Sequence, residues 1–192
     1  MSKRLKNSGI IVGAQNCHEN EIFGPFTGSV NSSMLKNVGA RYVIIGHSEN
    51  RKRGETNKLI NLKIKSALKS KLKVIFCIGE TLQEKRKKIT QNVLNTQIKL
   101  GLNKIKTKNN ILIAYEPVWS IGSGLIPKSK ELFNTISFIK KKYKKFKVIY
   151  GGSVNSKNIK ELKLINNIDG FLIGGSSQDP KKFIDIIKKT YN

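Results

Sequence analysis

The sequence contains few cysteines and no long apolar run. Cys17 and Cys77 are its only cysteines, and two thiols supply neither a disulfide framework nor the ligand spacing of a metal site. We therefore expect reduced thiols, with Cys77 packed in a core strand, and no bound metal. No stretch reaches the roughly 18 apolar residues of a membrane span, and the N-terminal MSKRLKNSG has no apolar signal region. These absences predict a cytoplasmic protein without a membrane partner.

Acidic residues are also scarce: 12 Asp and Glu stand against 37 Lys and Arg, which gives a formal net charge of +25. A basic nucleic-acid-binding module is therefore one alternative. Only five of the basic residues are Arg, and the Lys residues are spread over expected helix faces. Sequence-specific readers use Arg forks and interleaved aromatic side chains, so we expect no nucleic-acid partner. The abundance of Lys, Asn and Ile is typical of an AT-rich coding bias, although a positive field would speed the capture of a phosphorylated substrate.

The composition that remains is that of one globular domain. A chain of 192 residues can bury a hydrophobic core, since domains commonly contain roughly 100 to 200 residues. Fractions of 38% hydrophobic and 26% charged residues are typical of a folded soluble chain and not of a disordered one. We predict a single domain over residues 1–192.

Short apolar runs rich in β-branched residues recur along the chain, and each is apolar throughout. Strands covered on both faces in a parallel sheet have this pattern, whereas half-exposed strands alternate. The expected strands are Ile10–Ala14, Tyr42–Gly46, Val74–Gly79, Ile111–Glu116, Val148–Gly152 and Phe171–Gly175.

Amphipathic segments lie between these runs and predict helices. In Thr56–Lys69 an apolar stripe at helical spacing faces inward, with Lys outside; similar faces occur at Lys128–Lys141, Ser156–Leu164 and Asp179–Lys189. About six β-α repeats predict an α/β fold with right-handed crossovers. Periodicity leaves an open sheet and a barrel equally possible, but polar, Gly-rich sequence after nearly every strand favours a barrel or part of one, because barrel active sites form there.

Glu116 is the first candidate for chemistry. It ends an apolar strand and precedes Pro117, so its carboxylate projects from a rigid point into a partly dry site, as suits a general base. A capping or salt-bridged Glu would be the simpler interpretation of an isolated residue. The segment that follows, PVWSIGSG, has a rigid apolar middle and small residues near its end, which is typical of a hinged lid.

His47 is the second candidate. It follows the strand Tyr42–Gly46 in the segment GHSE, where backbone amides at the start of a helix would favour a neutral imidazole that donates a proton. A satisfied structural histidine is an equally good interpretation from the sequence. His18, the other histidine, lies in an expected loop and is interpreted as a surface residue.

Two glycine pairs end the last two expected strands, in Gly151-Gly152-Ser153 and Gly174-Gly175-Ser176. One pair alone would indicate only a tight turn. Two pairs at successive strand ends are better explained by backbone amides exposed to hold a dianionic phosphate, because glycine has no Cβ to block close approach.

These segments together resemble the triosephosphate isomerase family. The match is carried by residues 114–124, AYEPVWSIGSG, similar to the family's AYEPVWAIGTG, and by YGGSV at 150–154. Shorter matches follow the family's order over essentially the whole chain: GAQN at 13–16, FTG at 26–28, GHSE at 46–49, CIGET at 77–81 and DGFLIGG at 169–175.

The resemblance implies interconversion of dihydroxyacetone phosphate and glyceraldehyde 3-phosphate through an enediolate, with neither metal nor organic cofactor. It implies that Glu116 moves the proton between carbons and that neutral His47 polarises the carbonyl, supported by Ser48 and Glu49. The implied phosphate ligands are Gly122, Ser153, Gly174 and Gly175. Thr27, at the tip of the loop Cys17–Gly28, would reach into a partner subunit and make the active form a homodimer.

The sequence also departs from the family pattern. The family begins with a strand that carries Asn and Lys and continues through a second β-α unit, and nothing here matches either residue. The expectation is therefore an N-terminally truncated, incomplete barrel of about six of the eight units, in which Glu49 lacks its usual Lys neighbour. Asn50 replaces an Arg of the family's HSERR motif. An inactive or weakly active fragment that retains phosphate binding is thus an alternative to the active isomerase.

Overall fold

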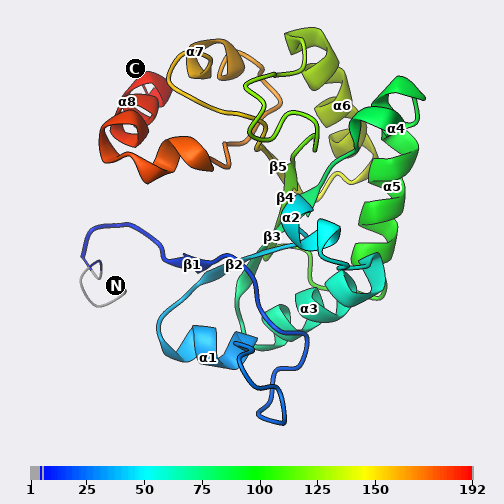
Figure 1. Ribbon diagram of the computed structural model, residues 1–192, viewed down its shortest axis with the longest axis vertical. Helices are drawn as coiled ribbons and strands as arrows, with labels where there is room; N and C mark the ends of the chain where they lie inside the picture. The colour runs from blue at the N-terminus through cyan, green and yellow to red at the C-terminus, as the bar shows by residue number, and fades with distance from the viewer. Residues whose placement is uncertain (1–4, 6, 192) are drawn as a thin grey trace. The chain divides into compact units, whose positions relative to one another are not determined.

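The computed structural model describes residue 5 and residues 7–191 (Figure 1). The chain forms two compact units. The first unit contains the described residues up to Cys77 together with Thr96–Leu112. The second unit contains Ile78–Asn95 and the described residues from Ile113 onward. The chain therefore passes between the units inside β3 (Lys73–Ile78), α5 (Thr90–Gly101) and β4 (Ile111–Tyr115).

The first unit contains three parallel strands in chain order, β1 (Gly13–Ala14), β2 (Tyr42–Ile45) and the main part of β3. Gly13 is in register with Tyr42, which is in register with Lys73. The strands are held by apolar packing, because Val43, Ile45, Val74 and Phe76 are completely buried. These residues alternate along each strand and so form one buried face, whereas Tyr42 and Ile44 on the other face of β2 are half-buried.

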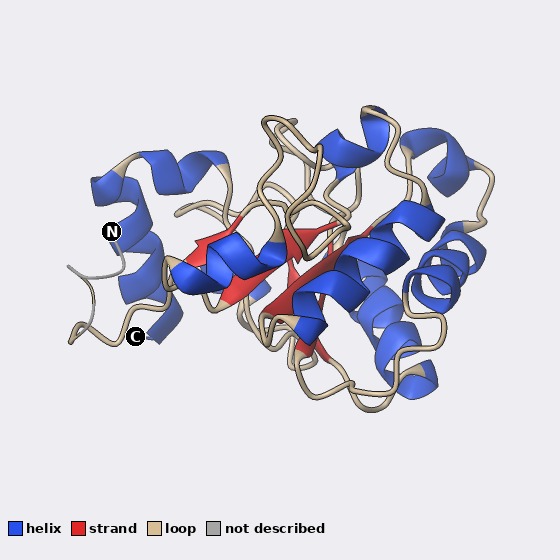
Figure 2. Ribbon diagram, turned by 90° about the horizontal axis from the view of Figure 1, so that it is seen from below, coloured by secondary structure: helices blue, strands red, loops and turns tan. Residues whose placement is uncertain are grey.

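Three helices follow these strands, α1 (Ser32–Asn37), α2 (Ser48–Lys52) and α3 (Asn57–Lys69). Thr56 caps α3 by accepting a hydrogen bond from the Leu59 N–H at 3.2 Å. Ile60, Ile64 and Ala67 form its fully buried stripe, as the helical spacing predicts. Residues 15–31, before α1, contain neither helix nor strand (Figure 2).

The second unit is built around the end of β4 and β5 (Lys147–Tyr150), which are neighbours in the sheet. The Gly151 N–H donates to the Tyr115 carbonyl at 3.0 Å. Beyond β5 the pairing continues only as an isolated parallel bridge between Tyr150 and Phe171. The helices of this unit are α4 (Leu82–Arg86), α6 (Ser129–Lys142), α7 (Ile159–Leu162), the 3-10 helix η1 (Gly175–Gln178) and α8 (Pro180–Tyr191).

The outer ends of the expected strand series are shorter in the structure than predicted. Ile10 and Ile11 are 62% and 53% exposed and lie outside β1. The expected strand Phe171–Gly175 is a single bridge, because Gly175 already begins η1. α7 is also shorter than the predicted helix, since the Asn155 side chain accepts from the Lys157 N–H at 2.9 Å and forms a competing turn.

Both cysteines are buried and neither forms a disulfide with a described residue, and Cys77 lies in β3, as predicted. Within the part of the chain that the structure describes, no helix combines the length and apolar content needed to cross a bilayer.

Candidate functional site

Glu116 directly follows β4 and is 5% exposed. Its backbone N–H donates to the Ile78 carbonyl at 2.8 Å, which extends the strand pairing to this residue. The carboxylate lies against the backbone of Gly151: a Cβ on Gly151 would come within 2.7 Å of the Glu116 Cγ and 2.8 Å of its Oε1. Glycine is therefore required at 151 to leave room for the carboxylate, a role distinct from the phosphate amides expected of this segment.

The segment after Glu116 is attached at its base to Glu80, which is 1% exposed. The Trp119 Nε1–H donates to Glu80 Oε1 at 2.9 Å, and the Tyr115 hydroxyl donates to the same carboxylate at 3.2 and 3.3 Å. The Val118 N–H adds a bond to the Glu80 carbonyl at 2.9 Å. Burial raises the pKa of the Glu80 carboxyl, while the Trp119 and Tyr115 bonds act in the opposite direction. No role was predicted for Glu80 from the sequence, although its position in CIGET, directly after a buried strand, was a usable signal.

The tip of this segment is exposed and conformationally unusual. Gly122 and Gly124 have φ values of +69° and +75°, which favour glycine. The Ser153 hydroxyl contacts the Ser120 carbonyl and accepts from the Gly124 N–H at 3.2 Å. Ser153 itself has φ +47°, so its side chain joins the turn after β5 to the turn after β4. Gly122 and Ser153 are thus part of one local arrangement in the second unit.

Gly174 and Gly175 lie at the start of η1, and both are exposed. A Cβ at either position would meet no atom within 4 Å, so the protein itself does not require glycine there. The first N–H groups of a helix have no partner within the helix and are available to an anion. Open space in front of such amides is compatible with a phosphate oxygen.

His47 lies in the first unit as the N-cap of α2, directly after β2 and Gly46. The Glu49 N–H donates to His47 Nδ1 at 3.4 Å. An Nδ1 that accepts carries no proton, so the neutral ring has its proton on Nε2, which becomes the donor. Ser48 is buried and Glu49 is exposed in the first turn of α2.

Arg51 supports the segment that carries His47. Its guanidinium donates to three acceptors: the Gly46 carbonyl at 2.7 Å, the Asn57 side chain at 2.8 Å and the Cys77 carbonyl at 3.1 Å. Burial lowers the pKa of its guanidinium below the usual value. Arg51 thus links the loop after β2 to the end of β3, a role for which its fork of planar donors is suited and Lys is not.

The loop that carries Thr27 projects two large apolar side chains. Thr27 is exposed, and Ile22 and Phe23 are 68% and 74% exposed. The rings of His18 and Phe26 are 4.6 Å apart, and the His18 side chain is only 19% exposed. His18 is therefore a loop residue that the Phe26 ring covers in part.

The base of this loop is held by a buried ionic cluster. The Lys63 Nζ donates to Glu55 Oε1 at 2.5 Å and to Asn16 Oδ1 at 3.2 Å, and Asn16 Nδ2 donates to the same Glu55 oxygen at 3.0 Å. Lys63 is 7% exposed, and it lies on the inward-facing stripe of α3, where its place in the helical spacing puts it. A buried cation needs a partner, and Glu55 supplies it.

Across the described residues, no group of three or more His, Cys, Asp or Glu side chains is arranged to hold a metal ion.

Comparison with known proteins gives one consistent result. The family model for triosephosphate isomerase matches residues 1–190. A triosephosphate isomerase of Thermodesulfovibrio yellowstonii is 43% identical over 98% of this chain and 80% of its own length, and one of Chlorobium luteolum is 42% identical over 98% and 79%. The crystal structure of triosephosphate isomerase from Bartonella henselae has a TM-score of 0.90 and 34% identity, and the match covers 100% of this chain and 81% of that one.

Proposed function

We propose that this chain, which belongs to the triosephosphate isomerase family, interconverts dihydroxyacetone phosphate and D-glyceraldehyde 3-phosphate through an enediolate. The observation that carries the proposal is the placement of Glu116, a buried carboxylate at a strand end for which Gly151 leaves room. The family pattern implies neither a metal nor an organic cofactor.

In the proposed reaction the Glu116 carboxylate removes a proton from the substrate carbon beside the carbonyl. The electron pair of that C–H bond forms the C=C bond of the enediolate, and the developing charge moves to the carbonyl oxygen. His47 would donate its Nε2 proton to that oxygen, because Nδ1 accepts from the Glu49 N–H. Glu116 then returns its proton to the neighbouring carbon, while His47 leaves its proton on the former carbonyl oxygen and takes the hydroxyl proton from the other oxygen, which becomes the new carbonyl. This division of roles is the established one for the family.

The substrate phosphate would be held by backbone N–H groups of Gly122, Ser153, Gly174 and Gly175. The Ser153 side chain supports this arrangement because it joins the turn that bears Gly122 to the turn after β5. The exposed tip with positive φ at Gly122 would close over the phosphate as a lid, as is established for the family. Ser48 and Glu49 would support His47 from the first turn of α2.

Isomerase turnover of the purified chain tests the proposal. We expect turnover in wild type, a loss of about 10²- to 10⁴-fold in Glu116→Gln, the range of a lost general base, and little change in Glu161→Gln, which removes an exposed carboxylate of α7. Binding of glycerol 3-phosphate is a second readout that Glu116→Gln should preserve. If wild type bound this ligand but turned over no faster than Glu116→Gln, the proposal would be wrong and the chain would be a phosphate-binding fragment.

A cytoplasmic homodimer is the finer part of the proposal. The exposed Ile22 and Phe23 beside Thr27 support it, because neighbouring exposed apolar side chains are typical of interfaces. We expect light scattering to give a dimer mass for wild type, and Thr27→Arg to shift the chain toward monomer. A monomer at tens of micromolar wild-type chain would contradict this part.

A further inference from the structure

Lys85, in α4, holds its ammonium group against the face of the Trp119 ring. The Lys85 Nζ lies 3.7 Å from the ring centroid, well inside the roughly 6 Å over which a cation and an aromatic face attract each other. The contacts of two other lysines with the rings of Tyr42 and Phe138 are longer, at 5.6 and 5.8 Å. Trp also presents the most favourable face to a cation, so the contact between Lys85 and Trp119 is the strongest of the three.

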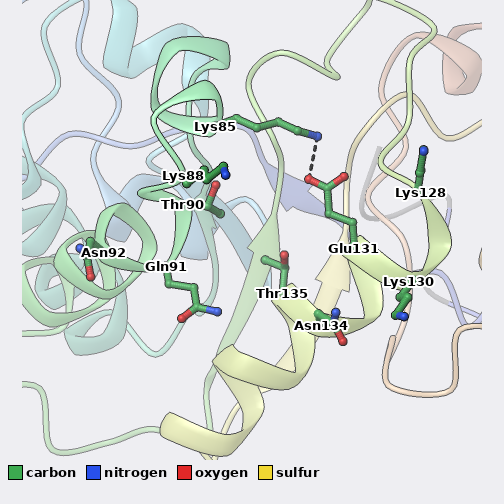
Figure 3. Close-up of a pocket in the computed structure, with 10 residues that line it drawn as sticks. All are labelled: Lys85, Lys88, Thr90, Gln91, Asn92, Lys128, Lys130, Glu131, Asn134 and Thr135. Atoms are coloured by element: carbon green, nitrogen blue, oxygen red, sulfur yellow. Dashed lines mark ion pairs between the residues drawn. The ribbon is translucent and has the colours of Figure 1, made fainter.

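The position of this ammonium group is set by two helices. Lys85 pairs with Glu131 in the first turn of α6 at 2.7 Å, and its side chain is 28% exposed. Figure 3 shows Lys85 extending from α4 toward Glu131. The start of α4 is itself fixed, because the Thr81 N–H donates to the Glu84 carboxylate at 2.7 Å and the Glu84 N–H donates to the Thr81 hydroxyl at 3.3 Å. Lys85 is therefore a held side chain and not a freely moving one.

Trp119 is consequently held in two directions. Its Nε1–H donates to the Glu80 carboxylate at 2.9 Å, but one hydrogen bond leaves the ring free to rotate about the line from donor to acceptor. The Lys85 ammonium on the ring face opposes this rotation. Burial raises the pKa of the Glu80 carboxyl, and the charge of Lys85 acts in the opposite direction, which favours the ionised acceptor. Lys85 thus stabilises both contacts of the indole ring.

The orientation of Trp119 affects the tip of the segment, because Ser120 follows it directly. Ser120 is completely buried, and its carbonyl contacts the Ser153 hydroxyl and accepts from the Ser123 hydroxyl at 3.1 Å. The Gly124 N–H donates to the same Ser153 hydroxyl at 3.2 Å. A rotation of the Trp119 side chain and its backbone would displace the Ser120 carbonyl, on which these contacts depend.

We propose that Lys85 is a positioning residue for the isomerisation, which fixes Trp119 and thereby aligns the backbone amides of the lid tip with the substrate phosphate. The inference rests on the proposed function and deepens it. Lys85 acts through Trp119 and not through the reacting carbons. The phosphate is bound in the ground state and in the transition state alike, so poorer alignment should raise KM and leave kcat nearly unchanged.

Steady-state isomerase kinetics of Lys85→Met test the proposal, because Met keeps most of the side-chain length but carries no charge. We expect KM for dihydroxyacetone phosphate to rise about 3- to 10-fold, the range of a lost cation–π contact at a partly buried ring. The Kd of glycerol 3-phosphate should rise by the same factor. Lys85→Arg, whose cation also stacks on aromatic faces, should restore both values. A chain that was merely less stable would show a lower apparent kcat and an unchanged KM.

Two further variants separate the contact with Trp119 from other effects of the charge. Lys87→Met is the matched control, because Lys87 is exposed and carries the same charge close to Lys85. In a chain that also contains Trp119→Leu, Lys85→Met should no longer raise KM, since no indole ring remains to be held. Equal KM changes in Lys85→Met and Lys87→Met would overturn the proposal. So would an effect of Lys85→Met that persisted in the presence of Trp119→Leu.

Fluorescence distinguishes failure of this proposal from failure of the proposed function. Trp119 is the only Trp, so acrylamide quenching reports on its ring without any substrate. Quenching should increase in Lys85→Met and remain at the wild-type level in Lys85→Arg and Lys87→Met. A wild-type chain that neither turned over nor bound glycerol 3-phosphate would contradict the proposed function, and quenching would still show whether Lys85 holds Trp119. Equal quenching in wild type and Lys85→Met would overturn the proposal whether or not the chain turned over.

Discussion

Burial changes the acid–base chemistry of individual side chains in this chain, and Cys17 is the clearest case. Burial raises the pKa of its thiol from 9.0 to about 11, and the nearby Lys63 offsets only part of this effect. The thiolate is the reactive form of cysteine. Cys17 and the buried Cys77 should therefore not react with thiol reagents at neutral pH until the chain unfolds.

The raised pKa of Cys17 predicts a specific pH dependence of stability. Below about pH 9 the thiol is protonated in both states, so its contribution is fully present. Between pH 9 and 11 the unfolded chain loses the proton first, so stability falls as pH rises. From about pH 8 to about pH 10.5 the free energy of unfolding should fall by about 2 kcal/mol more in wild type than in Cys17→Ala. Urea unfolding of wild type and Cys17→Ala at both pH values measures this fall in unfolding free energy. An equal fall in the two proteins would contradict the prediction.

The Lys63–Glu55 pair predicts a large effect of breaking one partner. Lys63→Met leaves the Glu55 carboxylate buried beside Asn16 without a cation, which should cost about 3–5 kcal/mol of unfolding free energy. Glu55→Leu combined with Lys63→Met removes both charges and should recover most of this loss. Chemical denaturation of the three proteins is the measurement. A double variant as unstable as Lys63→Met would mean that packing, and not charge, is the cause.

At the scale of elements, the segment after β4 depends on its attachment to Glu80. Trp119→Phe keeps an aromatic ring under Lys85 but removes the 2.9 Å hydrogen bond to the Glu80 carboxylate. A bond to a charged acceptor contributes about 1.5–3 kcal/mol, so stability should fall by this amount. The loss of unfolding free energy caused by Trp119→Phe should be smaller when Glu80→Gln is also present. Trp119 is the only Trp, so the variant has no Trp fluorescence and its unfolding is followed by circular dichroism. An equal loss of stability with Glu80 and with Gln at position 80 would exclude the proposed hydrogen bond.

The sequence predicts the inner elements better than the outer ones. The sequence segments that form β2 to β5 are apolar at nearly every position. Each of these four strands starts within one residue of the start that the sequence predicts. β1 and the segment that begins at Phe171 are shorter than predicted. The length of these strands depends on pairing with a neighbouring strand, and the apolar pattern of a segment contains no information about its neighbours. α5 was missed because its Asn and Thr residues are weak helix formers, although Leu94 and Ile98 pack completely buried inside.

In the candidate site, too, the sequence predicts some features and not others. Glu116, His47 and the glycine pairs follow strand ends and were recognisable as such. The roles of Glu80, Arg51 and the Ser153 side chain depend on contacts with residues far away in the chain, as does the room that Gly151 leaves for Glu116. No local pattern specifies such contacts, so they required the structure.

At the scale of the whole molecule, the net charge of +25 predicts an effect on association rate. A positive field attracts an anionic triose phosphate, and salt screens it over about 8 Å at physiological ionic strength. We expect kcat/KM to fall by about tenfold between 10 and 200 mM salt, while kcat remains nearly constant because the bound state is little affected. Steady-state kinetics across this range tests the prediction, and a salt-independent kcat/KM would contradict it.

The most direct test of the central claim follows the proton that Glu116 is proposed to move. Dihydroxyacetone phosphate incubated with the chain in D₂O should acquire solvent deuterium at the carbon beside the carbonyl, as NMR can detect. Glu116→Gln should reduce this exchange by about 10²- to 10⁴-fold, and Glu161→Gln should not. Exchange that persists at the wild-type rate in Glu116→Gln would show that another group removes the proton and would contradict the account.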